Sequence, residues 1–423
     1  MRNISVIKRD GVKVNFDTNK ISAAMLKAYD KVYKNYEKRD EVVKDAESIR
    51  DSIFSKPIDC INVEEIQDMV EELLMSKDPA AAKEYILYRD KRSREREKKS
   101  VVVKNVWQKI IPKTRVNDNA NVDDHSFSGR EKEASSALSK TIAVEYGGLD
   151  PEVAKAHRDM LVYQHDLEKA IYGSHNCLNL NFKEIFTHGF STRNGDVRPP
   201  SSYSTACQLL AVAFQCQSQV QYGGVGTIHL DYDLAPYVQM SYVKHLRTGL
   251  KWLCDYELSK DIKQLPIEDN EYIEKYPVAH KYAMEQLEKE IAQASEGLYH
   301  NLNTLESRQG SQVPFTSINL GRDTSPEGRM IIKGIFNASL NGIGKFHKTS
   351  IFPISIFQHK RGCNANPGDP NYDMKQLALK SLAKRIYPNF VNCDWAEAHE
   401  TEGDIDTYFS TMGKCKCSSC KIF

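Results

Sequence analysis

The residues with the clearest chemical potential lie between positions 175 and 224 of the 423-residue chain. A thiol, Cys177, stands in the run 175–178, where it could act as a redox group or fill a core position as a small apolar side chain. Glutamines alternate along 215–221, ahead of Gly223 and Gly224. In an extended segment these amides would project from one face and could bind hydroxyl or phosphate groups, while the glycines would let backbone approach a ligand. A polar strand and turn without a ligand is the alternative reading.

The first hundred residues predict a small module that could position a second set of polar groups. Apolar residues alternate from 4 to 16 around the turn Lys8-Arg9-Asp10-Gly11, which is typical of a β-hairpin. Asp17 or Thr18 can cap a helix that follows, and two further helical patterns precede a densely charged run at 89–99. Taken alone, the turn is an ordinary charged hairpin turn, and the charged run is a solvated helix end.

Chain length and the later pattern indicate a second, larger domain. A chain of 423 residues exceeds the size at which one core stops growing, about 250–300 residues. Beyond residue 100, helical patterns alternate with short apolar runs, which predicts a mixed α/β domain without choosing between a barrel and an open sheet. We expect a small domain at 1–98, a large one at 99–413 and a separate tail at 414–423.

The charge balance excludes several classes of partner. The chain has 58 basic and 57 acidic residues, so its net charge of +1 predicts no nucleic-acid or membrane binding, and phosphate recognition must be local. No run of about 18 apolar residues or signal peptide occurs, which favours a cytoplasmic protein. Its ten cysteines are therefore expected to be reduced thiols.

The N-terminal run 6–20 resembles the ATP-cone domain of ribonucleotide reductases. The resemblance implies that ATP or dATP binds there as an allosteric effector of overall activity. The residues that it implies for this effector site are Lys8, Arg9, Asp17, Lys20 and Lys91. ATP cones also occur in transcriptional repressors, so this domain alone does not identify an enzyme.

Several ordered motifs after the cone carry a second resemblance. The runs 119–130, 134–136, 150–159, 165–166 and 175–178 are similar to the anaerobic (class III) ribonucleoside-triphosphate reductases. That family implies an α/β fold in which the helical cone with its short hairpin is followed by a glycyl-radical-type ten-stranded barrel with many helices, here incomplete. It makes Cys177 the active-site cysteine beneath the ribose. The substrate-binding residues that it implies are His175, Asn176, Gln217, Ser218, Gln219, Gly223 and Gly224.

The family implies a reaction and a set of partners. A glycyl radical generates a thiyl radical, and ribonucleoside triphosphates are reduced to deoxyribonucleoside triphosphates for DNA replication, with formate or a thioredoxin-type protein as reductant. A homodimer and a radical-SAM activating enzyme are further implied.

The sequence departs from the family at its end. Directly after the position of Gly413 the family has its radical cysteine. This chain has Lys414 there, followed by Cys415, Cys417 and Cys420. Cys415 could replace that cysteine from a displaced position, or the three thiols could bind a metal, although they lack a fourth ligand. We expect instead that the reading frame leaves the reductase at Gly413, through an intervening sequence, a frameshift or a split gene, and that this tail binds no metal.

The glycyl-radical motif and the zinc-site cysteine pairs of the family do not occur in the sequence. Both are expected in a missing C-terminal part, which could be encoded separately. The alternative function is a catalytically inactive chain that binds ATP or dATP and regulates or pairs with an intact reductase.

Overall fold

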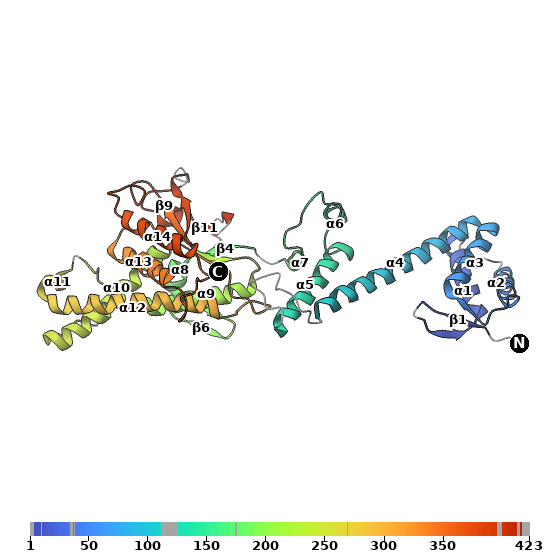
Figure 1. Cartoon of the computed structure of the whole chain (residues 1–423), viewed down its shortest axis with the longest axis horizontal. Helices are drawn as coiled ribbons and strands as arrows, with labels where there is room; N and C mark the ends of the chain where they lie inside the picture. The colour runs from blue at the N-terminus through green and yellow to red at the C-terminus, as the bar shows by residue number, and fades with distance from the viewer. Residues whose placement is uncertain are drawn as a thin grey trace. The chain divides into compact units, whose positions relative to one another are not determined.

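The computed structural model describes residues 4–9, 11–33, 37, 39–110, 126–173, 176–268, 270–395, 400–412 and 415–416. The chain divides into two compact units, Met1–Asn105 and Val106–Phe423 (Figure 1). The division falls within helix α4 (Pro79–Ile110), which also contains the charged run where the sequence predicts a boundary. Among the helices that the structure describes, none combines the length and the apolar character needed to cross a bilayer.

The first unit is a small three-stranded sheet covered by helices. Strands β1 (Ser5–Ile7) and β2 (Lys13–Asn15) form the predicted hairpin, and β3 (Cys60–Asn62) pairs parallel with β1. The turn of the hairpin needs Gly11, whose φ of 80° lies in the left-handed region. Helices α1 (Thr18–Val32), α2 (Arg39–Phe54) and α3 (Val63–Lys77) follow, ahead of α4.

The helix starts of this unit follow from local side-chain chemistry. The Asp17 carboxylate accepts a hydrogen bond from the Asn19 N–H at 3.0 Å, so Asp17, one of the two caps that the sequence offers, begins α1, and Thr18 is the first residue of the helix. The Asp78 carboxylate does the same for the Ala80 N–H at the start of α4, at 3.0 Å. Met25, with no measurable exposure, lies in a core that the helices share with β1 and β3.

The second unit alternates strands with helices. Its first part contains α5 (Phe127–Glu145), α6 (Pro151–Arg158), α7 (Leu167–Ala170), β4 (Leu178–Leu180), α8 (Phe182–His188), β5 (Phe190–Thr192), β6 (Gly195–Val197), α9 (Tyr203–Val220), β7 (Val225–Thr227) and α10 (Leu230–Cys254). Its second part contains α11 (Glu271–Lys275), α12 (Pro277–Thr304), β8 (Thr316–Leu320), α13 (Pro326–Asn341), β9 (Ile354–His359), α14 (Tyr372–Arg385), β10 (Asn389–Asn392), η2 (Ile405–Thr407), β11 (Thr411–Met412) and β12 (Cys415–Lys416).

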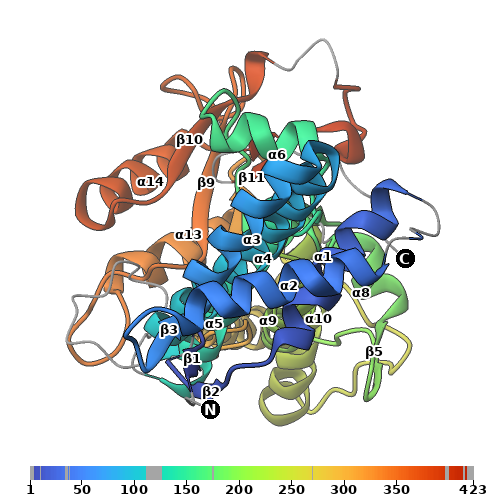
Figure 2. The same ribbon diagram turned by 90° about the vertical axis from the view of Figure 1, so that its right-hand side faces the viewer.

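Five of these strands form one parallel sheet in the order β10-β9-β8-β7-β4. The mixed α/β prediction is confirmed, with one five-stranded parallel sheet among the described residues. Helices α10, α12 and α13 pack together, and α14 packs on α13 and β9. Figure 2 shows α14 near α13 and β9. Residues of these helices share one apolar core with residues of β4, β7, β8 and β9.

The two faces of this sheet differ in polarity. Leu178 and Leu180 on β4 and Ile318 and Leu320 on β8 belong to the core shared with the helices. The residues between them must point to the opposite face, because side chains alternate along a strand. Those residues and one equivalent on β9 are polar amides, Asn179, Asn319 and Gln358, each at most 1% exposed. We call these three side chains the amide row.

Candidate functional site

Cys177 lies immediately before strand β4, beside the turn that leads into β7. The Gly224 N–H donates a hydrogen bond to the Cys177 Sγ over 3.3 Å, and the Cys177 thiol donates to the Asn176 Oδ1 over 3.5 Å. The side chain is half-buried. The backbone therefore holds this thiol in place while leaving it reachable, which a reactive cysteine requires. His175 lies outside the described residues.

The turn at Gly223 and Gly224 packs directly on the chain before β4. The Gly223 N–H donates to the Asn176 carbonyl at 2.8 Å, and the Leu178 N–H donates to the Gly224 carbonyl at 3.2 Å. A Cβ at position 223 would lie 2.3 Å from that Asn176 oxygen. The sequence predicts that these glycines let the backbone approach a ligand; at Gly223 the close neighbour in the structure is the protein's own backbone.

Replacing Gly223 with alanine is expected to lower the free energy of unfolding by roughly 1–3 kcal/mol, because the new methyl group would overlap the Asn176 backbone. Urea unfolding measures this change. Gly195→Ala is the matched control, since a Cβ there meets nothing within 4 Å. Equal stability of the two variants would contradict the packing described for this turn.

The glutamine run does not form the extended segment that the sequence predicts. Ser202 caps α9 through a hydrogen bond from the Thr205 N–H, and the helix continues to Val220. Successive residues on a helix are turned by about 100°, so Gln215, Gln217 and Gln219 do not share one face. The prediction was wrong because glutamine is compatible with a helix, and the apolar residues before it already commit the segment to one.

The predicted amide ligands therefore have separate environments. Gln217 is buried and donates to the Gln221 Oε1 at 2.9 Å. Gln221 donates in turn to the Gly224 carbonyl at 2.6 Å, so this pair supports the glycine turn. Ser218 and Gln219 line a cavity of about 670 Å³ together with Gln221 and Tyr222, which precede the glycine turn. The structure thus brings Cys177, Asn176, Gly223, Gly224, Ser218 and Gln219 into one region.

The segment 409–411, which ends at the first residue of β11, lies across the polar face of the sheet and is held there by the amide row. The Gln358 side chain donates to the Phe409 carbonyl at 2.7 Å, and the Asn179 side chain donates to the Ser410 hydroxyl at 3.2 Å. Asn319 makes two bonds to Thr411, donating to its carbonyl at 2.8 Å and accepting from its N–H at 3.2 Å.

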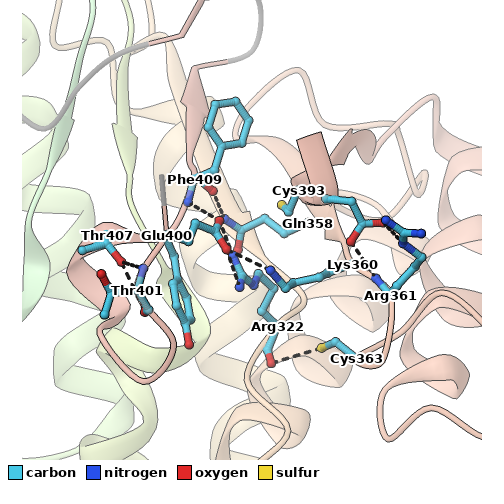
Figure 3. Close-up of polar contacts among 12 residues, drawn as sticks. Arg322, Gln358, Lys360, Arg361, Cys363, Cys393, Glu400, Thr401, Thr407 and Phe409 are labelled. Atoms are coloured by element: carbon cyan, nitrogen blue, oxygen red, sulfur yellow. Dashed lines mark hydrogen bonds and ion pairs between the residues drawn. The ribbon is translucent and has the colours of Figure 1, made fainter. Parts of the chain in front are cut away.

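A buried ion cluster holds the same segment from its N-terminal side (Figure 3). The Glu400 carboxylate accepts from both Nη atoms of Arg322, at 2.8 and 3.1 Å, and from the Lys360 Nζ at 3.0 Å. It also accepts from the Phe409 N–H at 2.8 Å. The Tyr408 ring lies over the Arg322 guanidinium, 3.9 Å from its carbon. The side chains of Glu400 and Arg322 are 3% and 4% exposed.

The charge state of Glu400 follows from these contacts. Burial alone raises the pKa of a carboxyl group, but the hydrogen bonds from Arg322, the Phe409 N–H and Lys360 outweigh it and lower the pKa of Glu400 to about 2. Glu400 is therefore ionised at neutral pH. Sequence reasoning missed this cluster because its members lie up to 78 positions apart and form no local motif.

A second cavity, of about 450 Å³, lies within the first unit between α1 and α4. Of the residues predicted to bind an effector, Arg9 and Lys20 line it, while Lys8, Asp17 and Lys91 do not. Asp17 caps α1 instead, and Lys91 is exposed on α4. The lining also contains basic residues that sequence reasoning did not select, which are Lys27, Lys31, Arg89, Arg92 and Arg96.

The spacing of these basic residues along the sequence could have indicated that they lie together. Lys20, Lys27 and Lys31 recur on α1 at intervals of seven and four, and Arg89, Arg92 and Arg96 recur on α4 at intervals of three and four. Residues at such intervals share one face of a helix. The run that we interpreted as a solvated helix end therefore contributes one side of this cavity.

Arg9 already has protein partners in this cavity. Its guanidinium contacts the Glu64 carboxylate and donates to the Gln67 Oε1 at 2.6 Å. The hydrogen bond from Arg9 outweighs burial and, with that from Arg89, lowers the pKa of Glu64 to about 2. An anionic ligand would have to compete with Glu64 for Arg9. Lys20 and Lys27, in contrast, form no ion pair with any residue that the structure describes.

Comparisons with known proteins match both units. Residues 4–94 match the family described as ATP cone domain, and residues 118–419 match the family described as anaerobic ribonucleoside-triphosphate reductase. The chain is 33% identical over 400 residues to the anaerobic ribonucleoside-triphosphate reductase of Haemophilus influenzae, covering 93% of this chain and 53% of that protein. The Escherichia coli protein of the same name is 32% identical over 395 residues, covering 92% of this chain and 51% of that protein.

A solved structure is similar at lower identity. The anaerobic ribonucleotide reductase from Thermotoga maritima in complex with dATP and CTP aligns with a TM-score of 0.43 and 16% identity, covering 71% of this chain and 50% of that chain. The chain spans about half the length of the curated relatives that it matches.

Proposed function

Because this chain belongs to the anaerobic ribonucleoside-triphosphate reductase family, we propose that it takes part in reducing ribonucleoside triphosphates to deoxyribonucleoside triphosphates. The observation that carries the proposal is the placement of Cys177, which the Gly224 N–H holds at the edge of a parallel sheet, next to a turn whose preceding residues Gln221 and Tyr222 line a polar cavity. In this reaction the C2′ hydroxyl leaves as water and carbon gains hydrogen. The two electrons come from formate or a thioredoxin-type protein, and Cys177 is the donor beneath the ribose.

The neighbouring residues have distinct proposed roles. Asn176, Gly223 and Gly224 support the thiol, whereas Ser218 and Gln219 face the cavity where polar groups of a substrate would lie. The buried pair of Gln217 and Gln221 holds the glycine turn. His175 keeps the role that the family resemblance implies, as a neighbour of the substrate.

Further components belong to the same proposal. A glycyl radical supplies the hydrogen-atom abstraction that starts the reaction, and its motif is not among the 423 residues. We assign the radical glycine and the zinc site to another part of the enzyme, on this polypeptide or a second one. A radical-SAM activating enzyme and a second copy of the chain are the remaining proposed partners.

The reductase proposal is tested in two steps. Equilibrium dialysis with labelled CTP should detect binding to the 423-residue chain. Anaerobic incubation with CTP, formate or thioredoxin, and an activated glycyl-radical fragment of the Haemophilus influenzae relative should then yield dCTP. Binding of ATP without CTP binding or dCTP formation would support the alternative, a regulatory chain.

ATP and dATP are the proposed effectors of the first unit, with the cavity between α1 and α4 as their site. Lys20→Gln is expected to weaken ATP binding about tenfold, because it removes a cation that has no carboxylate partner among the described residues. Calorimetry on the whole chain measures this affinity. Lys44→Gln, an exposed change on α2 outside the cavity, should leave the affinity unchanged. Equal ATP affinities of the wild type, Lys20→Gln and Lys44→Gln would exclude Lys20 as a ligand.

A further inference from the structure

The guanidinium of Arg308, in the connection between α12 and β8, binds the glycine turn that precedes β7. Its Nη1 donates to the Gly223 carbonyl at 2.8 Å, and its Nη2 donates to the Tyr222 carbonyl. The guanidinium carbon lies 4.2 Å from the centroid of the Phe315 ring. The Arg308 backbone N–H donates to the Gln312 carbonyl at 3.0 Å. The backbone and the side chain of this arginine are therefore both held against the turn.

A single peptide group connects Arg308 to Cys177. The Gly223 carbonyl and the Gly224 N–H belong to the same planar peptide group, in which they point in opposite directions. The carbonyl accepts from Arg308, while the N–H donates to the Cys177 Sγ at 3.3 Å. The Gln221 Nε2 lies 3.4 Å from the same carbonyl oxygen and is a weaker, neutral donor. A charged donor at the carbonyl fixes the plane of the peptide group and makes its N–H a stronger donor to the sulfur.

The positive charge of Arg308 acts on the groups around it. No carboxylate of the described residues forms an ion pair with Arg308, whose two Nη atoms donate to carbonyls instead. Burial, together with repulsion from Arg308 and Lys169, lowers the pKa of Lys132 to about 8. Burial also lowers the pKa of Arg308 itself, while attraction to the negative forms of Cys177 and Asp166 opposes that shift. The same attraction favours a negative charge on the Cys177 sulfur.

The other charged side chains that line the cavity beside this turn are Lys132 on α5, Asp166, and Glu168 and Lys169 on α7. Lys132 responds to Arg308, because removal of the guanidinium would lessen the repulsion on Lys132 and raise its pKa. Lys132 donates to the Gln312 Oε1 at 2.5 Å and not to the turn. It therefore does not replace Arg308 at the Gly223 carbonyl.

We propose that Arg308 is a positioning residue for Cys177, acting through the peptide group between Gly223 and Gly224 to hold the sulfur in place and to favour its negative form. This inference rests on the proposed function, in which Cys177 donates hydrogen to the ribose. Hydrogen transfer depends strongly on the distance between the reacting atoms, so a donor sulfur must be held in one position. Arg308 needs no contact with the substrate for this role.

The pH dependence of Cys177 alkylation by iodoacetamide tests the proposal on the whole chain, because the thiolate is the form that reacts. Peptide mass spectrometry distinguishes Cys177 from the exposed Cys60 and Cys216. In Arg308→Gln the pH midpoint of the reaction should rise by about one unit, since a charge-assisted hydrogen bond and a nearby positive charge are lost. The rate below the midpoint should accordingly fall about tenfold. Above both midpoints the rates of the variant and the wild type should converge.

Two further variants separate this role from a general effect on folding. Arg308→Lys keeps the charge but cannot bind both carbonyls, so its midpoint should rise by about half a unit. Arg247→Gln is the matched control, because Arg247 on α10 also binds two backbone carbonyls, those of Ser259 at 3.3 Å and Ile262 at 3.0 Å. Its Cys177 profile should equal that of the wild type.

Several outcomes would overturn the proposal. These are an unchanged midpoint in Arg308→Gln and an equal shift in Arg247→Gln. Faster alkylation of Arg308→Gln at every pH would also overturn it, because the turn would then merely have opened. If Arg308→Gln does not fold, Arg308→Lys decides, and a midpoint at or below that of the wild type would refute the role of Arg308.

Activity provides a readout that depends on the reductase proposal, whereas alkylation needs neither CTP nor the radical fragment. In the anaerobic reaction with CTP, Arg308→Gln should form dCTP about tenfold more slowly than the wild type. If the wild type forms no dCTP but the pH shift is found, the link between Arg308 and Cys177 stands and the reductase proposal is wrong. If dCTP is formed and the midpoint does not move, the inference about Arg308 is wrong and the reductase proposal stands.

Discussion

Cys177→Ser is expected to reduce dCTP formation at least about a thousandfold in the reconstituted anaerobic reaction, with CTP binding retained. A serine side chain is similar in size and can still accept the hydrogen bond from the Gly224 N–H. Its hydroxyl cannot donate a hydrogen atom or form a disulfide as a thiol can. The loss should therefore lie in turnover and not in affinity. Product analysis and dialysis with labelled CTP measure the two quantities separately.

Cys216→Ser provides the matched control. Cys216 is an exposed cysteine on α9, and its replacement removes a thiol without touching the turn beside Cys177. Its dCTP yield should equal that of the wild type. Retained activity in Cys177→Ser, or an equal loss in both variants, would refute the role assigned to Cys177.

Glu400→Gln should lower the free energy of unfolding by about 3 kcal/mol, because it leaves Arg322 and Lys360 in a buried site without a negative partner. The same change weakens the contact to the Phe409 N–H, so the segment that crosses the amide row should loosen as well. Urea unfolding measures the first effect. Hydrogen exchange of the amides at 409 and 411 measures the second.

The stability contribution of Glu400 should also depend on pH. The folded protein lowers the pKa of this carboxyl group from 4.5 to about 2, so the unfolded chain binds the proton more readily. The contribution is therefore complete above about pH 5 and is lost as the pH falls from 4.5 towards 2. The stability difference between wild type and Glu400→Gln should shrink over this acid range.

Glu296→Gln is the control for this carboxylate. Glu296 forms a pair with His300 along α12 and its side chain is 55% exposed, so the change should cost less than about 0.5 kcal/mol. A similar small loss in Glu400→Gln would show that the buried cluster does not stabilise the fold.

Local patterns predicted the small elements well. The alternation around Gly11 gave the β1–β2 hairpin, and Asp17 caps α1 as expected, because both features depend on residues a few positions apart. The parallel sheet was foreseen only as mixed α/β, since pairing between distant strands leaves no periodic signal. The glutamine run shows the limit of periodicity, because α9 continues through a spacing that also suits a strand.

The site residues also divide into those that the sequence indicated and those that only the folded chain brings together. Resemblance located Cys177 and the glycine turn, but it did not indicate Lys132 and Arg308, which meet across 176 positions of sequence in one cavity. Burial and charge of such residues arise only once the chain has folded. The same holds for Glu400, whose partners come from two strand ends and a connecting segment.

The amide row has a consequence for how this protein can vary during evolution. Gln358 and Asn319 recognise peptide groups, and only the Asn179 contact uses a side chain of the docked segment, that of Ser410. Most side chains at 409–411 can therefore change without altering the position of this segment against the amide row. Paired β-strands tolerate many sequences for the same reason, because their hydrogen bonds join peptide groups. Proline at 409 or at 411 is the exception, since it lacks the N–H that donates to Glu400 or to Asn319. Natural variants should accumulate substitutions along this segment while sparing the amides beneath it.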